Sequence, residues 1–165
     1  MSTVEISAST GEVSAAARAD INFLAGLAMP EVFLYFFPSF YIAIFQILTS
    51  FTKKVERFAL GIPRGFAKTT FIKCLALWYI LFSDKHFILI VAASEGKAKA
   101  ILADIMDMLG SPNIRRIFGH YDSNIEKDDA TTKVFHFRGK EMILWAMGAQ
   151  SSVRGINRKH YRPDV

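Results

Sequence analysis

Runs of apolar residues, separated by short polar connections, divide the chain into predicted helices and strands. Helical periodicity or an apolar character on nearly all sides predicts helices over residues 21–29, 39–52, 69–82 and 95–109. The third of these is apolar almost all round, which predicts a buried helix. Ser94 stands directly before the fourth and is predicted to be its N-cap. A shorter helix is predicted over 113–118, and residues 1–20 form a polar leader.

Strands are predicted where apolar residues run without interruption or alternate with polar ones. They are residues 56–62 and 86–92, followed by a hairpin of 133–137 and 141–147. The run 86–92 is apolar throughout, which is typical of a strand covered on both faces. The acidic stretch 122–131 predicts a loop, and residues 163–165 predict the start of another strand. The order strand, turn, helix, strand, helix indicates an α/β fold that opens with a parallel sheet.

Composition excludes a few classes of protein but does not identify one. The length of 165 residues allows about one domain, and 52% hydrophobic residues exclude a disordered chain. The single cysteine, Cys74, lies in the predicted buried helix, and it excludes both a disulfide framework and a multi-cysteine zinc site. A net charge of +5 is compatible with a polyanionic partner and equally with an ordinary solvated surface.

One uncharged stretch, between Glu31 and Lys53, has about the length needed to cross a bilayer. Pro38 interrupts this stretch, and polar side chains such as Gln46 would lie in hydrocarbon. A buried helix after a proline turn is therefore favoured, and no membrane contact is expected. A membrane-associated or scaffold protein with residues 32–51 in the bilayer stays the alternative.

The stretch IPRGFAKTT, residues 62–70, lies between a predicted strand and a predicted helix, as a phosphate-binding loop does. Gly65 permits torsion angles that other residues avoid, and Ala67 is small enough for the close approach of a ligand. Lys68 offers an ammonium to the β- and γ-phosphates of a nucleotide, and Thr69 offers a hydroxyl to Mg²⁺.

The loop departs from the standard pattern G-x-x-x-x-G-K-[ST], because Ile62 and Ala67 stand where that pattern has glycine. An ordinary strand-to-helix turn is therefore an alternative. The loop nevertheless resembles the variant Walker A motif of tailed-bacteriophage terminase large subunits, in which an Arg precedes a Gly-x-(Gly/Ala)-Lys-(Ser/Thr) core. FPSFYIAIFQIL resembles the upstream segment of that family, HFILIVAASEGKAKAILADIMDML the strand and helix after the loop, and GAQSSVRGINRKHYRPDV the stretch leading to its Walker B strand.

The resemblance implies a P-loop NTPase fold of the RecA-like (ASCE) class, a three-layer domain with a central, mainly parallel sheet. Residues 1–52 would be a leader and a helical segment with the adenine-contact region, and residues 53–165 an ATPase core that is incomplete at its C-terminus. The implied function is that of the N-terminal portion of a motor that uses ATP and Mg²⁺ to move double-stranded DNA into procapsids.

Individual roles follow from the resemblance residue by residue. It places Gln46 on adenine, Lys68 and Thr69 on phosphate and Mg²⁺, and Arg64 on the γ-phosphate, with Arg154 as an arginine finger toward a neighbouring subunit. The implied nucleotide-binding positions are Gln46, Pro63, Arg64, Gly65, Phe66, Ala67, Lys68, Thr69 and Thr70. The implied catalytic positions are Arg64, Lys68 and Arg154, and the metal position is Thr69.

The family continues after RPDV into an apolar strand that ends in an acidic pair, and then into a nuclease domain. This sequence contains neither, so weak nucleotide binding and negligible hydrolysis are expected of it alone. The implied partners are double-stranded DNA, the portal protein, the small terminase subunit and further copies in a ring. The implied location is the host cytoplasm and, transiently, the portal vertex of the procapsid. Another P-loop translocase or helicase-like ATPase is a further alternative.

No metal centre is predicted from spacing alone. The histidines lack metal-ligand spacing and are predicted to be ordinary surface or strand residues: His86, His120, His136 and His160. The acids Glu126, Asp128 and Asp129 are predicted to lie in a solvated loop.

Overall fold

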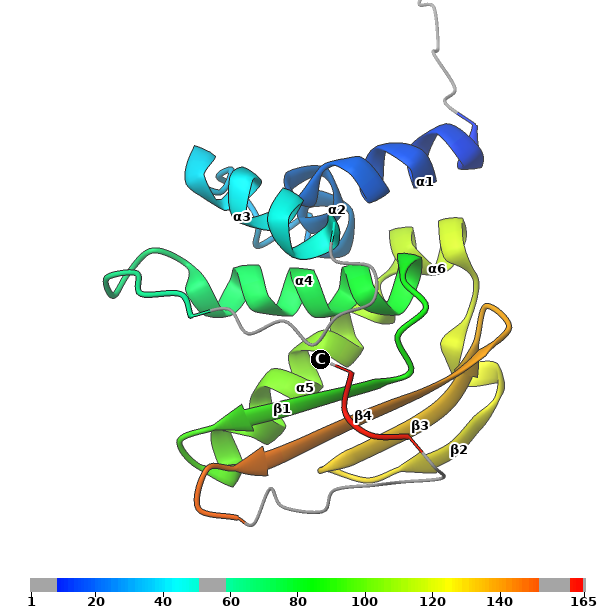
Figure 1. Cartoon of the computed structure of the whole chain (residues 1–165). Coiled ribbons are helices and arrows are strands. Elements are labelled where there is room, and N and C mark those ends of the chain that lie inside the picture. The colour runs from blue at the N-terminus through cyan, green and yellow to red at the C-terminus, as the bar shows by residue number, and fades with distance from the viewer. Residues whose placement is uncertain (1–8, 51–58, 152–160, 165) are drawn as a thin grey trace, which may run out of the picture.

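Helices lie over one face of a four-stranded sheet in the computed structural model, which describes residues 9–50, 59–151 and 161–164 (Figure 1). The helices are α1 (Thr10–Ala19), α2 (Ile21–Ala28), α3 (Ser39–Ser50), α4 (Lys68–Phe82), α5 (Glu95–Leu109) and α6 (Pro112–Phe118), with a 3-10 turn η1 (Tyr121–Ser123). The strands are β1 (Phe87–Ala92), β2 (Ile125–Asp128), β3 (Thr132–Phe137) and β4 (Lys140–Gly148). The predicted helices and the predicted hairpin are confirmed, each to within a few residues over its described part.

The strand order is β1-β4-β3-β2, with β1 parallel to β4 and the other two pairings antiparallel. The prediction of a mainly parallel sheet is therefore wrong, and the sheet is mixed. The reason is local, because strands joined by tight turns, as β3 and β4 are at Arg138-Gly139, pair antiparallel. The predicted strand 56–62 is also wrong over 59–62, which are irregular, whereas 56–58 lie outside the described residues.

Two further strand predictions need correction. β1 stands at the end of the strand order, and it is buried only at Phe87 and Ile88, so it is not covered on both faces along its length. The acidic stretch 122–131 is not all loop, since β2 pairs with β3 there. Asp164 is not part of a strand, but its carboxylate accepts hydrogen bonds from the amides of His86 (2.9 Å) and Phe87 (3.0 Å).

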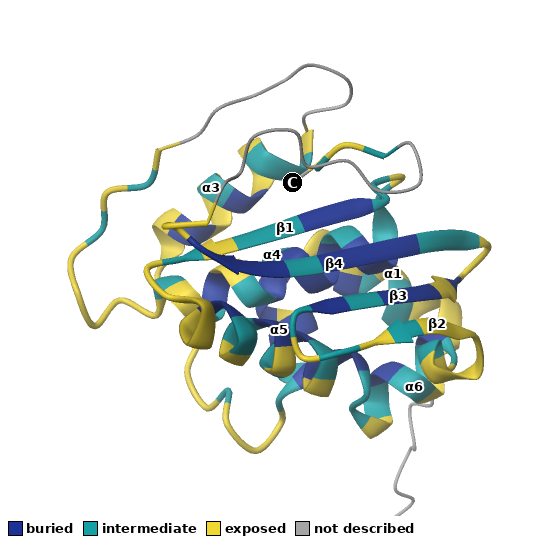
Figure 2. Cartoon of the chain, turned by 90° about the horizontal axis from the view of Figure 1, so that it is seen from below, coloured by how far each residue is buried: buried dark blue, intermediate teal, exposed yellow. Residues whose placement is uncertain are grey.

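The core is built around α4, which is buried as its composition predicts. Its buried side chains are Phe71, Cys74, Ala76, Leu77, Trp78, Ile80 and Leu81. α5 packs on β1 and β4 beneath α4, and α2 contacts α4 from the other side. Seen from below, the strands lie in front of the helices, so the helices cover one face of the sheet (Figure 2). Burial raises the pKa of the Cys74 thiol to about 12, which makes it a small neutral core group.

No described helix is long and apolar enough to cross a bilayer. α3, which occupies most of the uncharged stretch considered above, has 12 residues and is buried only at Tyr41 and Phe45, so the prediction of a buried helix here is wrong over most of its length. At 1.5 Å per residue such a helix spans about 18 Å, whereas the hydrocarbon core of a bilayer is about 30 Å thick.

Lys140 joins the hairpin to the C-terminal end of α4. Its ammonium donates hydrogen bonds to the carbonyl oxygens of Tyr79 (3.2 Å), Ser83 (2.6 Å) and Lys85 (3.2 Å). A cation is favoured at this end of a helix, where the last carbonyl groups have no intrahelical partner. Burial lowers the pKa of Lys140 to about 8, because the charged form loses hydration there.

The close approach of β4 to the start of α5 gives a prediction for Gly148. A Cβ at this position would lie 2.9 Å from the amide nitrogen of Glu95. We expect Gly148→Ala to lower the free energy of unfolding by about 1–3 kcal/mol through overpacking. Gly96→Ala, where a Cβ meets nothing within 4 Å, is expected to raise it by up to about 1 kcal/mol, because alanine favours helix. Urea denaturation measures the free energy of unfolding of both variants. Equal changes in the two would contradict the close contact between Gly148 and the start of α5.

The lowered pKa of Lys140 gives a pH dependence with a definite sign. Above about pH 8 the folded chain has lost this proton, whereas the unfolded chain keeps it up to its ordinary pKa of about 10.4. The unfolded state then binds more protons, so the free energy of unfolding rises with pH across this interval. We expect urea denaturation of Lys140→Met, compared with the wild type at several pH values, to lack this rise. The exposed Lys97→Met should keep it, and an unchanged pH profile in Lys140→Met would refute the assignment.

Candidate phosphate-binding loop

The loop before α4 has the backbone conformation that the sequence predicts for a sharp bend. Gly65 has a φ of +88°, and Ala67, the residue before the helix, lies in the left-handed region with φ 53° and ψ 26°. A Cβ at Gly65 would meet nothing within 4 Å, so it is the torsion angle and not space that favours glycine. Alanine at 67 has a small steric cost in this region, and it leaves the approach to the helix open. The loop is bent and solvent-exposed from Pro63 to Ala67.

α4 begins without a side-chain cap, unlike α1, α2 and α5. Those three helices are capped by Ser9, Asp20 and Ser94, the last as predicted. At the start of α4, the first backbone amide that donates to a backbone carbonyl is that of Phe71, whose acceptor is the Ala67 carbonyl at 2.9 Å. The amides of residues 68–70 have no acceptor among the described residues, so they are available to an anion at the positive end of the helix.

Lys68 lies over the same bend. Its ammonium donates to the carbonyl oxygens of Ile62 and Pro63, the second at 2.7 Å. These bonds place the positive charge of Lys68 beside the loop. An incoming phosphate offers a charged acceptor in place of two neutral carbonyls, and hydrogen bonds to charged groups are the stronger ones.

The loop is held to α3 by Tyr41. The Tyr41 hydroxyl donates to the Phe66 carbonyl at 2.6 Å, and its ring stacks on Phe71 with the centroids 4.5 Å apart. Burial raises the pKa of the Tyr41 phenol, so the group stays a hydrogen-bond donor across the neutral range. This anchor is a residue that the sequence analysis missed. It lies inside the segment FPSFYIAIFQIL, for which another residue, Gln46, was predicted to be the functional one.

The other predicted site residues are brought together only in part. Gln46 is exposed on α3, and no hydrogen bond joins it to the loop among the described residues. Arg64 is exposed and makes no ion pair with a described residue. Its predicted contact with a γ-phosphate stays a prediction. The hydroxyl of Thr69 is bonded to no described carboxylate. Arg154 lies outside the described residues, and its role as an arginine finger stays a prediction.

Two hollows flank the first turns of α4. A larger one of about 940 Å³ is lined by Thr70, by the ion pair of Lys73 with Asp104, and by Arg115. A smaller apolar one of about 260 Å³ lies between α4, β1 and α5, and it includes Thr69 and Ile72. Thr70 and Thr69, at the end of the loop, thus line one hollow each, the first with charged and apolar walls and the second apolar, and residues 62–68 line neither.

A second group of polar side chains lies on the strands. One ligand atom each of Glu126, His136 and Glu141 lies within 4.8 Å of the others. The sequence analysis missed this group, since the three residues come from three different strands and only the strand register could have revealed it.

Comparison of the chain with protein-family models, with curated proteins and with solved structures found no match.

The anchor gives a prediction for Tyr41→Phe. The change removes the hydrogen bond to Phe66 and keeps the ring that stacks on Phe71, so we expect the free energy of unfolding to fall by about 0.5–1.5 kcal/mol. We also expect faster tryptic cleavage after Arg64, because the loop loses its tie to α3. Tyr35→Phe is the matched control, as Tyr35 is 86% exposed. Unchanged stability and cleavage in Tyr41→Phe would show that the bond does not hold the loop.

Proposed function

We propose that the loop of residues 63–70 binds the phosphates of ATP with Mg²⁺, and that the chain is the N-terminal portion of a viral DNA-packaging ATPase. The observation that carries the proposal is the uncapped start of α4. There, free amides at 68–70 and the Lys68 ammonium lie at one exposed bend that is made by Gly65 and Ala67. Converging backbone amides and a lysine at a helix start are the features that a polyphosphate requires.

Each residue of the loop has a distinct task in the proposed complex. The amides of 68–70 donate to phosphate oxygens, while Lys68 leaves the carbonyls of Ile62 and Pro63 and contacts the β- and γ-phosphates. Thr69 supplies the hydroxyl ligand of Mg²⁺, which keeps water and phosphate oxygens in its other positions. Arg64, exposed and free of ion pairs among the described residues, is available for the γ-phosphate.

Hydrolysis of ATP requires acidic groups that binding of ATP does not require. An acid is needed to help hold Mg²⁺ and another to activate the attacking water, and no described carboxylate is bonded to Thr69 or Lys68. We therefore propose that this chain binds nucleotide and turns it over negligibly. Turnover well below about 1 s⁻¹, the low end for ordinary enzymes, is expected of it alone.

The packaging role rests on the resemblance of the loop and of the segments around it, because the mixed sheet does not argue for it. In that role the chain would act on double-stranded DNA with the portal protein and the small terminase subunit, in a ring of copies. It would work in the host cytoplasm and at the portal vertex. The net charge of +5 is compatible with a polyanion as substrate.

The lysine gives the direct test by substitution. We expect Lys68→Ala to weaken the binding of ATP and Mg²⁺ by roughly tenfold or more, since it removes a charge-assisted contact worth about 1.5–3 kcal/mol. Isothermal titration of the 165-residue chain measures the affinity. Lys97→Ala is the matched control, because Lys97 is an exposed lysine in the first turn of another helix.

The proposal fails if the wild type binds no ATP at millimolar concentrations, or if Lys68→Ala and Lys97→Ala bind it alike. It also fails in its second half if the chain alone hydrolyses ATP at an ordinary enzymatic rate.

A further inference from the structure

We propose that Glu126, His136 and Glu141, on three neighbouring strands of the sheet, form a binding site for one divalent transition-metal ion of the zinc class. The three residues are called the strand cluster below. It is separate from the proposed nucleotide loop, because it lies at the start of β4, next to Lys140, which bonds the C-terminal end of α4, whereas the loop precedes the N-terminal end of that helix.

The register of the sheet creates the cluster. His136 on β3 lies directly opposite Glu141 on β4 in the antiparallel ladder, so both side chains point to the same face. That face is the one opposite the helices, since Val134, two residues from His136, packs on Ile143 in the smaller apolar cluster. The pair is thus held by backbone hydrogen bonding and not by side-chain contact alone.

A bulge in β2 brings the third residue to this pair. Ile125 pairs with Phe135 and Lys127 with Val134, so Glu126 is an extra residue at the point where the register shifts. A bulge interrupts the alternation of side chains and re-aims the inserted one. Here the Glu126 carboxylate reaches His136, with Oε1 3.5 Å from Nδ1.

The spacing of the ligand atoms suits a small metal ion. In a tetrahedral zinc site with bonds of about 2.0–2.2 Å, neighbouring ligand atoms lie roughly 3.3–3.5 Å apart. The Glu126–His136 separation of 3.5 Å already has this value, and all three ligand atoms lie within 4.8 Å of one another. Glu126 and His136 are exposed and Glu141 is half-buried. In the proposed complex the two glutamate side chains exchange their present contacts for the ion and close the remaining separation, and a fourth position is left for water.

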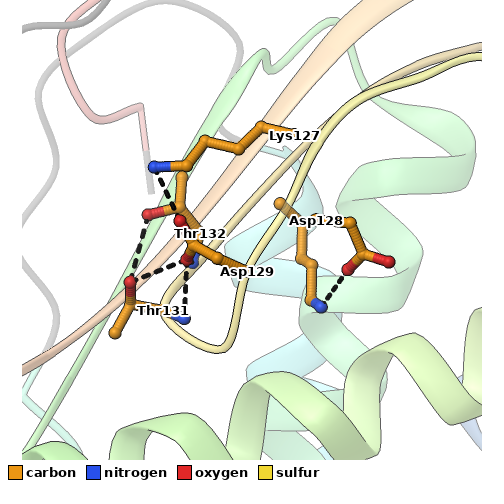
Figure 3. A network of polar contacts seen from close by, with 6 residues as sticks. Lys127, Asp128, Asp129, Thr131 and Thr132 are labelled. Atoms are coloured by element: carbon orange, nitrogen blue, oxygen red, sulfur yellow. Dashed lines mark hydrogen bonds and ion pairs between the residues drawn. The ribbon is translucent and has the colours of Figure 1, made fainter.

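Three lysines of the two hairpins bind acceptors outside the strand cluster. Lys127 pairs with Asp129 at 2.7 Å, and Lys133 pairs with Asp128 (Figure 3). The Asp129 carboxylate also accepts from Thr131 and Thr132, and the pKa of this group is lowered chiefly by the bond from Lys127. Lys140 donates to the end of α4. Each of these three lysines thus has an acceptor outside the strand cluster.

The donor set favours one class of ion. Imidazole nitrogen binds zinc, cobalt and related ions well, whereas calcium and magnesium prefer oxygen ligands alone. One nitrogen and two carboxylate oxygens therefore select a transition metal. Bound there, the ion would join β2, β3 and β4 on the face opposite the helices and so stabilise the edge of the sheet that β2 forms.

The test uses the nucleotide-free 165-residue chain, treated with a chelator and then titrated with Co²⁺, whose visible absorption reports ligation, and with Zn²⁺ in competition. We expect one equivalent to bind, Zn²⁺ to displace Co²⁺, and millimolar Mg²⁺ to displace neither. His136→Ala, Glu126→Gln and Glu141→Gln should each weaken binding by roughly tenfold or more. Zn²⁺ should raise the melting temperature of the wild type and raise that of these variants much less.

His120→Ala is the matched control, because His120 is an exposed histidine 3.8 Å from a single carboxylate, that of Asp122. It should bind the metal as the wild type does. Since Glu126 and His136 are exposed and Glu141 is half-buried, the metal-free variants should melt near the wild type; should one fail to fold, the other two decide the test. The proposal is overturned if the wild type binds no equivalent of Co²⁺ or Zn²⁺, or if the three cluster variants bind as tightly as His120→Ala. Failure here would leave the nucleotide loop untouched, since the titration contains no nucleotide.

Discussion

Burial of α4 is the constraint on which the rest of the molecule depends. The helix is apolar on nearly all sides, so it is stable only where other elements cover it, and α5 and α2 do so from two directions. Three polar groups fix it against the N-terminal helices as well. The Trp78 indole donates to the Arg18 carbonyl at 2.9 Å, the Tyr79 hydroxyl donates to Leu48 at 2.9 Å, and Tyr41 bonds the loop in front of the helix at Phe66. A helix held in this way presents its first turn, and the bend before it, at a fixed place on the surface.

Local chemistry accounts for what could be predicted from the sequence. Helix periodicity, the Ser94 cap and the turn between β3 and β4 are decided by neighbouring residues, and these predictions are confirmed. The bend at Gly65 and Ala67 is local too, and both residues have the positive φ that a tight loop requires.

Pairing between distant segments accounts for what could not be predicted. The sequence 125–128 is polar, yet it forms a strand because β3 offers it hydrogen-bond partners. The expectation of a parallel sheet, which came from the order of elements and from a family resemblance, fails for a local reason, since strands joined by short connections pair antiparallel, and two of the three pairings are of this kind. His136 is one of four scattered histidines until strand register places it opposite Glu141 and a bulge turns Glu126 toward it. The sequence likewise places Tyr41 in an apolar helix, and only the packing of α3 on the loop shows that its hydroxyl donates a hydrogen bond to Phe66.

The central claim is that the amides at the start of α4 bind the phosphates of a nucleotide, and backbone NMR tests it most directly. Titration of the ¹⁵N-labelled chain with ATP and Mg²⁺ should shift the amide resonances of Gly65 and of residues 68–70 first and furthest, with smaller shifts along α3 near Tyr41. Shifts that gather instead around Lys73, Asp104 and Arg115 in the larger hollow, or no shifts at saturating nucleotide, would contradict the account.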